Sequence, residues 1–173
     1  VTRVLRLTVN QGFTLLANPL DRGSNSVAVV FPAPPAGAQV VTYDPVGRMF
    51  ITNSFQSGAW SSPSALLNPG EGFFFHNSSG APFVFALEGR MQLTGPARSL
   101  ASGLHLLSGR YPRAGTPNEA IEFPLLAGDT VYRFNNASAS YSVHRYSGSG
   151  WDLAAPLDIA EGFLMLLGPR TGQ

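Results

Sequence analysis

Apolar positions along the chain repeat mostly every second residue, which is the period of a β-strand rather than of an α-helix. The first segment, VTRVLRLTV at residues 1–9, largely alternates in this way and is rich in β-branched residues. Similar segments follow at intervals of roughly ten residues, separated by turn sequences such as PAPPAG, DPVG and NPGEG. The pattern predicts an all-β fold of small sandwich-like or barrel-like domains with mostly antiparallel strands. The expected strands are 1–9, 13–16, 27–31, 39–43, 49–52, 72–76, 83–87, 104–107, 120–123, 130–134, 141–146 and 162–167, with one short helical turn at 63–67.

These segments occur twice in the same order. Residues 12–75 match residues 103–165 at an offset of 91, with a one-residue slip before the second EGF sequence. The matched pairs include Gly12 and Gly103, Gly37 and Gly128, Phe50 and Tyr141, Trp60 and Trp151, and Glu71 and Glu161. We therefore predict two tandem homologous domains at 11–94 and 103–173, a linker at 95–102 and a separate N-terminal strand at 1–10.

The two copies end differently. The first continues through SSGAPFVFALEG into one more strand, whereas the second ends at GPRTGQ, before that strand. A vacant strand position exposes backbone N–H and C=O groups along a sheet edge. We predict that residues 1–10 fill this position, either within one chain or in a neighbouring subunit by strand complementation. The assembly strand comprises Val1, Arg3, Val4, Leu5, Arg6, Leu7 and Val9, with Val4, Leu5, Leu7 and Val9 pointing inward, and the acceptor groove comprises Phe163, Leu164, Met165, Leu166 and Leu167.

Composition narrows the possible functions. Charged residues make up only 12% of the chain, about half the usual share, and the net charge is +1 with dispersed arginines. Neither nucleic-acid binding nor membrane insertion is expected, because clustered cations and a long apolar segment are both lacking. Cysteine and lysine are absent, which excludes disulfides, thiolate metal sites and lysine Schiff bases. With its start at Val1, this composition predicts a processed, secreted or cell-surface bacterial protein.

The repeat resembles a known type of sequence. The segments GFTLLANPLD, PPAGAQVVTYDPVGRMF, GAW and LLNPGEGFFFHNSSG, with GLHLLSGRYPRAG and FPLLAGDTVYRFNN in the second copy, carry the resemblance. They are similar to a duplicated Gly/Pro-rich β-repeat of uncharacterised secreted or cell-surface proteins of environmental bacteria. The resemblance covers nearly the whole chain and implies no activity or catalytic residues. In such sequences the second copy runs on into one more strand, which residues 1–9 resemble.

The matched Glu71 and Glu161 allow two interpretations. Paired carboxylates are typical of glycoside hydrolases, whereas a glutamate beside a tight glycine turn can accept backbone N–H groups once per copy. Duplication favours the structural interpretation, because an active site seldom needs one catalytic acid in each repeat. Since the chain also has no GxSxG nucleophile motif, we predict no catalytic residue.

Trp60 and Trp151 follow glycine-rich turns and also allow two interpretations. An exposed ring can stack on a sugar, with Tyr43 as a third candidate, whereas a buried ring would close one end of a core. The matched positions favour packing. His76, His105 and His144 lie far apart without the spacing of a zinc site, so no metal or cofactor is predicted.

Taken together, these features predict a non-enzymatic, extracellular structural subunit. It would assemble head to tail with other copies into a surface filament or layer, through complementation by residues 1–10. The alternative is a carbohydrate-binding or adhesion module that recognises surface glycans with Trp60, Trp151 and Tyr43.

Overall fold

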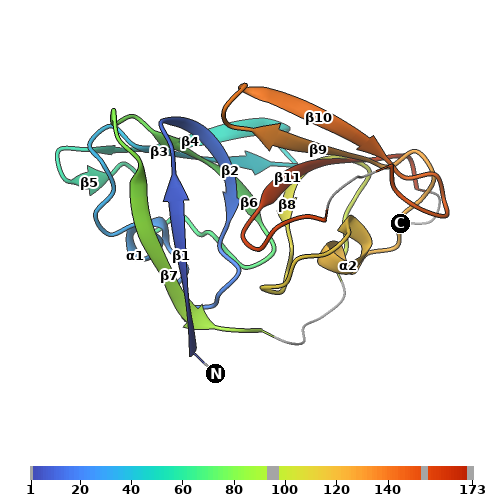
Figure 1. The fold of residues 1–173 in the computed structure, drawn as a ribbon, viewed down its shortest axis with the longest axis horizontal. Helices are drawn as coiled ribbons and strands as arrows, with labels where there is room; N and C mark the ends of the chain where they lie inside the picture. Colours follow the sequence, from blue (N-terminus) through green and yellow to red (C-terminus); the bar gives the residue numbers. More distant parts are fainter. Residues whose placement is uncertain (1, 93–97, 153–155, 171–173) are drawn as a thin grey trace.

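The computed structural model describes residues 2–92, 98–152 and 156–170 (Figure 1). Over these residues the prediction of an all-β fold with mostly antiparallel strands is confirmed, because every strand pair is antiparallel and only two short helices are present. Neither helix is long and apolar enough to cross a membrane. The first-half elements are β1 (Thr2–Val9), β2 (Gly12–Ala17), α1 (Val27–Val30), β3 (Gln39–Asp44), β4 (Met49–Gln56), β5 (Ala59–Trp60), β6 (Gly72–Asn77) and β7 (Phe83–Arg90). The second-half elements are β8 (Gly103–Ser108), α2 (Pro117–Ile121), β9 (Thr130–Asn135), β10 (Ser140–Arg145) and β11 (Gly162–Leu167).

Three sheets form over the described residues. One has the order β2-β6-β3-β4-β5, the second has the order β8-β11-β9-β10, and the third is the two-stranded ribbon β1-β7. Matched sequence positions occupy matched places in the two larger sheets, because β8, β11, β9 and β10 are the sequence counterparts of β2, β6, β3 and β4. The exact domain bounds stay a prediction, and most of the linker at 95–102 lies outside the described residues.

The β1-β7 ribbon covers one face of the five-stranded sheet (Figure 1). Aromatic rings fill the space between the two layers. Phe75 of β6 stacks on Phe83 of β7 with ring centroids 5.6 Å apart, and Phe31, just after α1, lies 4.9 Å from Phe85. Large buried side chains of this kind supply most of the hydrophobic stabilisation of a small domain. The four-stranded sheet has its own core, in which Ile121 of α2 is fully buried.

Two segments that were predicted as strands are helices. Residues 27–31 contain α1, and residues 120–123 contain the end of α2 and the chain after it. The expected helical turn at 63–67 contains no helix, and its carbonyls at Pro63 and Ala65 instead accept from the backbone N–H groups at the start of α1. α2 begins with a capping box, because the Thr116 side chain accepts from the Glu119 backbone and Glu119 accepts from the Thr116 backbone. Such a box satisfies N–H groups that the first helical turn leaves free.

The structure differs from the prediction for residues 1–10. β1 pairs in cis with β7, the last strand of the first half, along eight residues from Thr2 opposite Arg90 to Val9 opposite Phe83 (Figure 1). Leu5, Leu7 and Val9 face the core as expected. Val4 is 59% exposed, because strand alternation places it on the outer face beside Arg6. Arg3 and Arg6 are exposed, and Val1 lies outside the described residues.

The predicted acceptor groove is also different. It lies on β11, which pairs with β8 along Phe163–Leu167 and with β9 over Leu164–Leu166. Both edges of β11 therefore pair with neighbouring strands, whereas an acceptor groove requires one free edge. Phe163, Met165 and Leu167 are buried in the second core, Leu164 is buried against the first half, and Leu166 is exposed. An added strand would find no vacant backbone position on β11.

The two larger sheets meet through a contact that repeats itself. Leu16 bridges Glu161, and the matched Leu107 bridges Glu71. The backbone N–H of Ala17 donates to the carbonyl of Ala160 at 2.9 Å, and the matched N–H of Ser108 donates to the carbonyl of Gly70 at 3.0 Å. Each half thus offers the same surface to the other, which is the pattern of a twofold, isologous interface. We call this the twofold contact.

Candidate functional site

A groove lined by aromatic rings crosses from the first half to the second beside the twofold contact. Its cavity has a volume of about 390 Å³. We call it the aromatic groove, and it is lined by Phe13, Gln39, Val41, Phe50, Thr52, Phe74, Phe134 and Tyr141. None of these eight residues is charged. A mostly apolar cavity with a few polar side chains is the usual form of a ligand site.

Strand alternation explains why these rings share one face. In the first sheet, Val40 and Phe75 are paired in register and point into the core under the β1-β7 ribbon. Their neighbours Val41 and Phe74, also paired in register, point to the opposite face. Both faces of this sheet are therefore apolar. The second face is only partly covered by the second half, and the aromatic groove lies on its uncovered part.

The rings form a connected cluster around Phe74, which is buried. The ring centroid of Phe74 lies 6.2 Å from that of Phe13, 6.4 Å from that of Phe50 and 5.5 Å from that of Phe134, all edge to face. Tyr141 joins the cluster at 5.1 Å from Phe134. Edge-to-face packing holds rings in defined orientations. The groove therefore has a fixed floor, while Phe13, Phe50 and Tyr141 keep 41%, 49% and 45% of their surface exposed.

Polar groups at the groove are neutral. Gln39 and Thr52 offer an amide and a hydroxyl, and partial burial raises the pKa of Tyr141, so its hydroxyl stays protonated at neutral pH. The Asn136 side chain, in the turn between β9 and β10, donates to the carbonyl of Phe13. That hydrogen bond ties the second half to β2 at the end of the groove. A neutral ligand with both apolar and hydroxyl surfaces fits this lining best.

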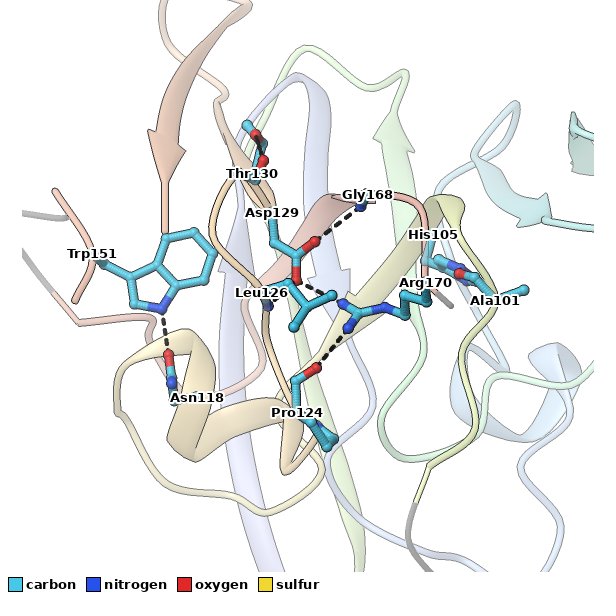
Figure 2. A network of polar contacts seen from close by, with 11 residues as sticks. Ala101, His105, Asn118, Pro124, Leu126, Asp129, Thr130, Trp151, Gly168 and Arg170 are labelled. Atoms are coloured by element: carbon cyan, nitrogen blue, oxygen red, sulfur yellow. Dashed lines mark hydrogen bonds and ion pairs between the residues drawn. The ribbon is translucent and has the colours of Figure 1, made fainter. Parts of the chain in front are cut away.

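The two tryptophans lie away from the groove and are packed into the cores. Trp60 is 5% exposed, and its Nε1–H donates to the carbonyl of Phe31 at 3.0 Å, so its ring is unavailable for stacking. Trp151 is half-buried against the second core, where its Nε1–H donates to the Asn118 side chain (Figure 2) and its ring contacts Tyr146. The packing interpretation is confirmed for Trp60. Of the three predicted stacking residues, only Tyr43 lies near the groove, 5.0 Å from Phe50.

The matched glutamates support backbone structure. Oε2 of Glu71 accepts from the backbone N–H of Asn68 at 3.3 Å, and Oε2 of Glu161 accepts from that of Asp158 at 2.8 Å. Glu161 also holds Arg133 through two hydrogen bonds of 2.6 and 2.8 Å, which raise the pKa of that guanidinium. Each glutamate thus makes the contact that the structural interpretation expects, because each accepts a backbone N–H three residues earlier in the chain.

The histidines do not come together. Nε2 of His105 contacts the carbonyl of Ala101 at 2.8 Å (Figure 2), and Nδ1 of His144 lies 3.5 Å from Asp152. The ring of His76 lies 4.4 Å from that of Phe13. In the part of the chain that the structure describes, no group of three or more His, Asp or Glu side chains is arranged to hold a metal ion.

Sequence reasoning missed most of the groove. The available signal was the matched pair Phe50 and Tyr141, which places an aromatic residue at the same point of the second hairpin strand in both copies. Comparisons with protein-family models, with curated proteins and with solved structures found no match, so the resemblance to a bacterial secreted repeat stays a prediction.

Proposed function

We propose that the chain is a non-enzymatic, extracellular binding module that holds a neutral carbohydrate chain in the aromatic groove. The observation that carries this proposal is the set of three half-exposed rings, Phe13, Phe50 and Tyr141, around an uncharged groove. The C–H faces of a sugar ring are apolar and pack well on aromatic faces, while its hydroxyls need hydrogen-bond partners. Gln39, Thr52 and the Tyr141 hydroxyl are placed to provide them.

A ligand longer than one sugar suits the groove better than a monosaccharide. Phe50 belongs to the first half and Tyr141 to the second, with Phe74 and Phe134 between them in the chain of ring contacts. A ligand that rests on both exposed rings must therefore cross from one half to the other. Pre-formed contacts of this kind cost little ordering entropy on binding.

Phe50→Ala and Tyr141→Ala are each expected to weaken oligosaccharide binding at least tenfold, which is about 1.4 kcal/mol. Each change removes one stacking surface and leaves the buried floor in place. Calorimetric titration with neutral hexasaccharides of glucose, xylose and N-acetylglucosamine would measure the loss. Val84→Ala is the matched control, because Val84 is an exposed apolar residue on the outer face of β7. Wild-type protein that binds none of the sugars, or alanine variants that bind as tightly as wild type, would contradict the proposal.

The second candidate function is self-assembly, in which β1 would be exchanged between chains. It is favoured by the eight-residue pairing of β1 with β7 and by the inward anchors Leu5, Leu7 and Val9, which together form a self-contained docking strand. The same strand from a neighbouring chain would make the same contacts on β7. Repeated head-to-tail exchange would then produce a filament.

A reversible disulfide between β1 and β7 would distinguish assembly by strand exchange from other modes of assembly. Thr8 and Val84 are opposite each other in the β1-β7 register and are both exposed, so a Thr8→Cys, Val84→Cys pair is expected to form a disulfide within one chain. The locked protein should remain monomeric in size-exclusion chromatography and electron microscopy, and reduction should restore the polymers formed by wild type. Polymers from the oxidised protein, or a wild type that stays monomeric at high concentration, would refute exchange.

A further inference from the structure

A larger cavity, of about 530 Å³, lies where Glu71 bridges Leu107 at the twofold contact. We call it the Arg98 cavity. Most of its wall is apolar and includes Ile51, Leu66, Leu67, Pro69 and Leu106, and Arg98 contributes a cation to it. It is distinct from the aromatic groove, because the two cavities share no lining residue.

The guanidinium of Arg98 has only neutral partners. Its Nη2 donates to the carbonyl of Gly70 at 2.8 Å and more weakly to the carbonyl of Ser108 at 3.5 Å. Its Nη1 is buried and has no hydrogen-bond partner, and no ion pair is formed by Arg98 with any described residue. A buried donor without a partner is costly, and a buried charge without a counter-charge is more so.

Arg98 nevertheless keeps its charge at neutral pH. Burial lowers the pKa of its guanidinium to about 10, and the positive charge of Arg110 acts in the same direction. The charge of Glu71 favours the protonated form, but the Glu71 carboxylate accepts from the backbone and side chain of Asn68 instead of pairing with Arg98. The cavity wall therefore carries the positive charge of Arg98, which no carboxylate of the described chain contacts, and also includes Glu71, whose carboxylate is held by Asn68.

The matched cavity in the other half contains an ion pair of a kind that the Arg98 cavity lacks. That cavity, of about 460 Å³, lies at the second bridge of the twofold contact, between Leu16 and Glu161. Its cation, Arg133, is held by Glu161 through a pair of short hydrogen bonds. The position that matches Arg133 is Thr42, whereas Arg98 precedes the matched residues 103–165 and has no counterpart in the repeat. The two cavities thus hold their cations differently, and of Arg98 and Arg133 only Arg133 is paired with a carboxylate among the described residues.

We propose that the Arg98 cavity binds a small amphipathic carboxylate, with the carboxylate on the Arg98 guanidinium and the apolar part against Leu66, Leu67 and Leu106. A guanidinium can donate two parallel hydrogen bonds to a carboxylate. Nη1 is covered here, so binding requires a small movement of the guanidinium toward the cavity. The volume lies within the usual range of ligand cavities, and the apolar wall suits an alkyl or aryl chain. This inference is independent of carbohydrate binding in the aromatic groove.

Octanoate is the first probe, because it combines a carboxylate with a short alkyl chain. We expect calorimetry or chemical-shift titration to detect octanoate binding to wild type, a loss of at least tenfold in affinity in Arg98→Gln, and weaker binding of octan-1-ol. Arg6→Gln removes the same charge from an exposed position on β1 and should leave affinity unchanged. No octanoate binding to wild type, or equal binding to wild type and Arg98→Gln, would overturn the proposal.

A second variant covers the case in which Arg98→Gln does not fold. Leu66 is exposed and lines the cavity, so Leu66→Glu changes little in the core but adds a carboxylate to the cavity that Arg98 also lines. This carboxylate is expected to occupy the guanidinium and to lower octanoate affinity at least tenfold. Leu126→Glu, at an exposed leucine outside the cavity, is the matched control. Unchanged octanoate binding in folded Leu66→Glu would show that Arg98 does not receive the carboxylate.

Discussion

Gly72→Ala and Gly162→Ala are each expected to destabilise the protein by about 2–3 kcal/mol, and by similar amounts, because both over-pack the twofold contact. A Cβ on Gly72 would lie 2.5 Å from the carbonyl oxygen of Leu107, and a Cβ on Gly162 would lie 2.5 Å from that of Leu16. Backbone oxygens cannot turn aside as a flexible side chain can. The two halves would have to move apart, and the adjacent hydrogen bonds at Gly70 and Ala160 would lengthen.

The matching controls are Gly80→Ala and Gly150→Ala. No atom lies within 4 Å of the Cβ that either change would add, and neither glycine has a positive φ. A glycine in such a position can become alanine with a small gain in stability, because the unfolded chain loses freedom. Urea unfolding of the four variants would measure the differences. A small effect at Gly72 or Gly162, or a large effect at one and not the other, would mean that the contact is not the repeated interface that we describe.

Alternation was enough to predict most strands, because a strand needs only local period-two patterning. It was not enough at residues 27–31, an apolar run of five residues, or at residues 120–123, Ala-Ile-Glu-Phe, because segments this short suit either a strand or a helix. For α2 the deciding signal was present in the sequence. Thr116, Pro117 and Glu119 form the typical start of a helix, with a cap, a proline in the first turn and a glutamate three residues after the cap.

The partner of β1 could not be read from its own sequence. Leu5, Leu7 and Val9 show which face is apolar, but they suit any apolar groove of the right length. β7 offers a matching set, because Phe83, Phe85 and Leu87 face the same core. Pairing of two strands some eighty residues apart in the chain depends on how the intervening sheet places them, which single-strand patterning does not contain.

The aromatic groove was missed for a related reason. Phe73, Phe74 and Phe75 are consecutive, so the strand is apolar on both faces and its pattern does not say which face meets solvent. The tryptophans were the more conspicuous signal, yet the carbonyl of Phe31 lies where it can accept from Trp60 inside the core. Which aromatic ring becomes exposed is settled by the packing of the two halves, and this depends on Gly72 and Gly162.

The largest loss of stability is expected for Asp129→Ala. Asp129 is fully buried, and its carboxylate accepts from the backbone N–H of Leu126 at 2.8 Å and of Gly168 at 2.9 Å, and from the Arg170 side chain at 2.6 Å (Figure 2). These contacts join the loop before β9 to the segment after β11. Removing one partner of a buried ion pair leaves the other charge uncompensated and typically costs about 3–5 kcal/mol. Urea unfolding should show that loss, whereas Asp152→Ala, at an exposed carboxylate, should change stability little.

A double variant distinguishes the charge pair from the rest of the network. In Asp129→Leu, Arg170→Met no unpaired charge remains, so the loss should be smaller than in Asp129→Leu alone. The equivalent position in the first half is stabilised without an ion pair. Ala38 and Ser78 match Asp129 and Gly168, and the Ser78 hydroxyl donates to the carbonyl of Ala36 at 2.8 Å instead. Additive losses in the double variant would mean that Asp129 stabilises the second half mainly through its two backbone N–H partners, because only then would removing Arg170 fail to relieve the loss.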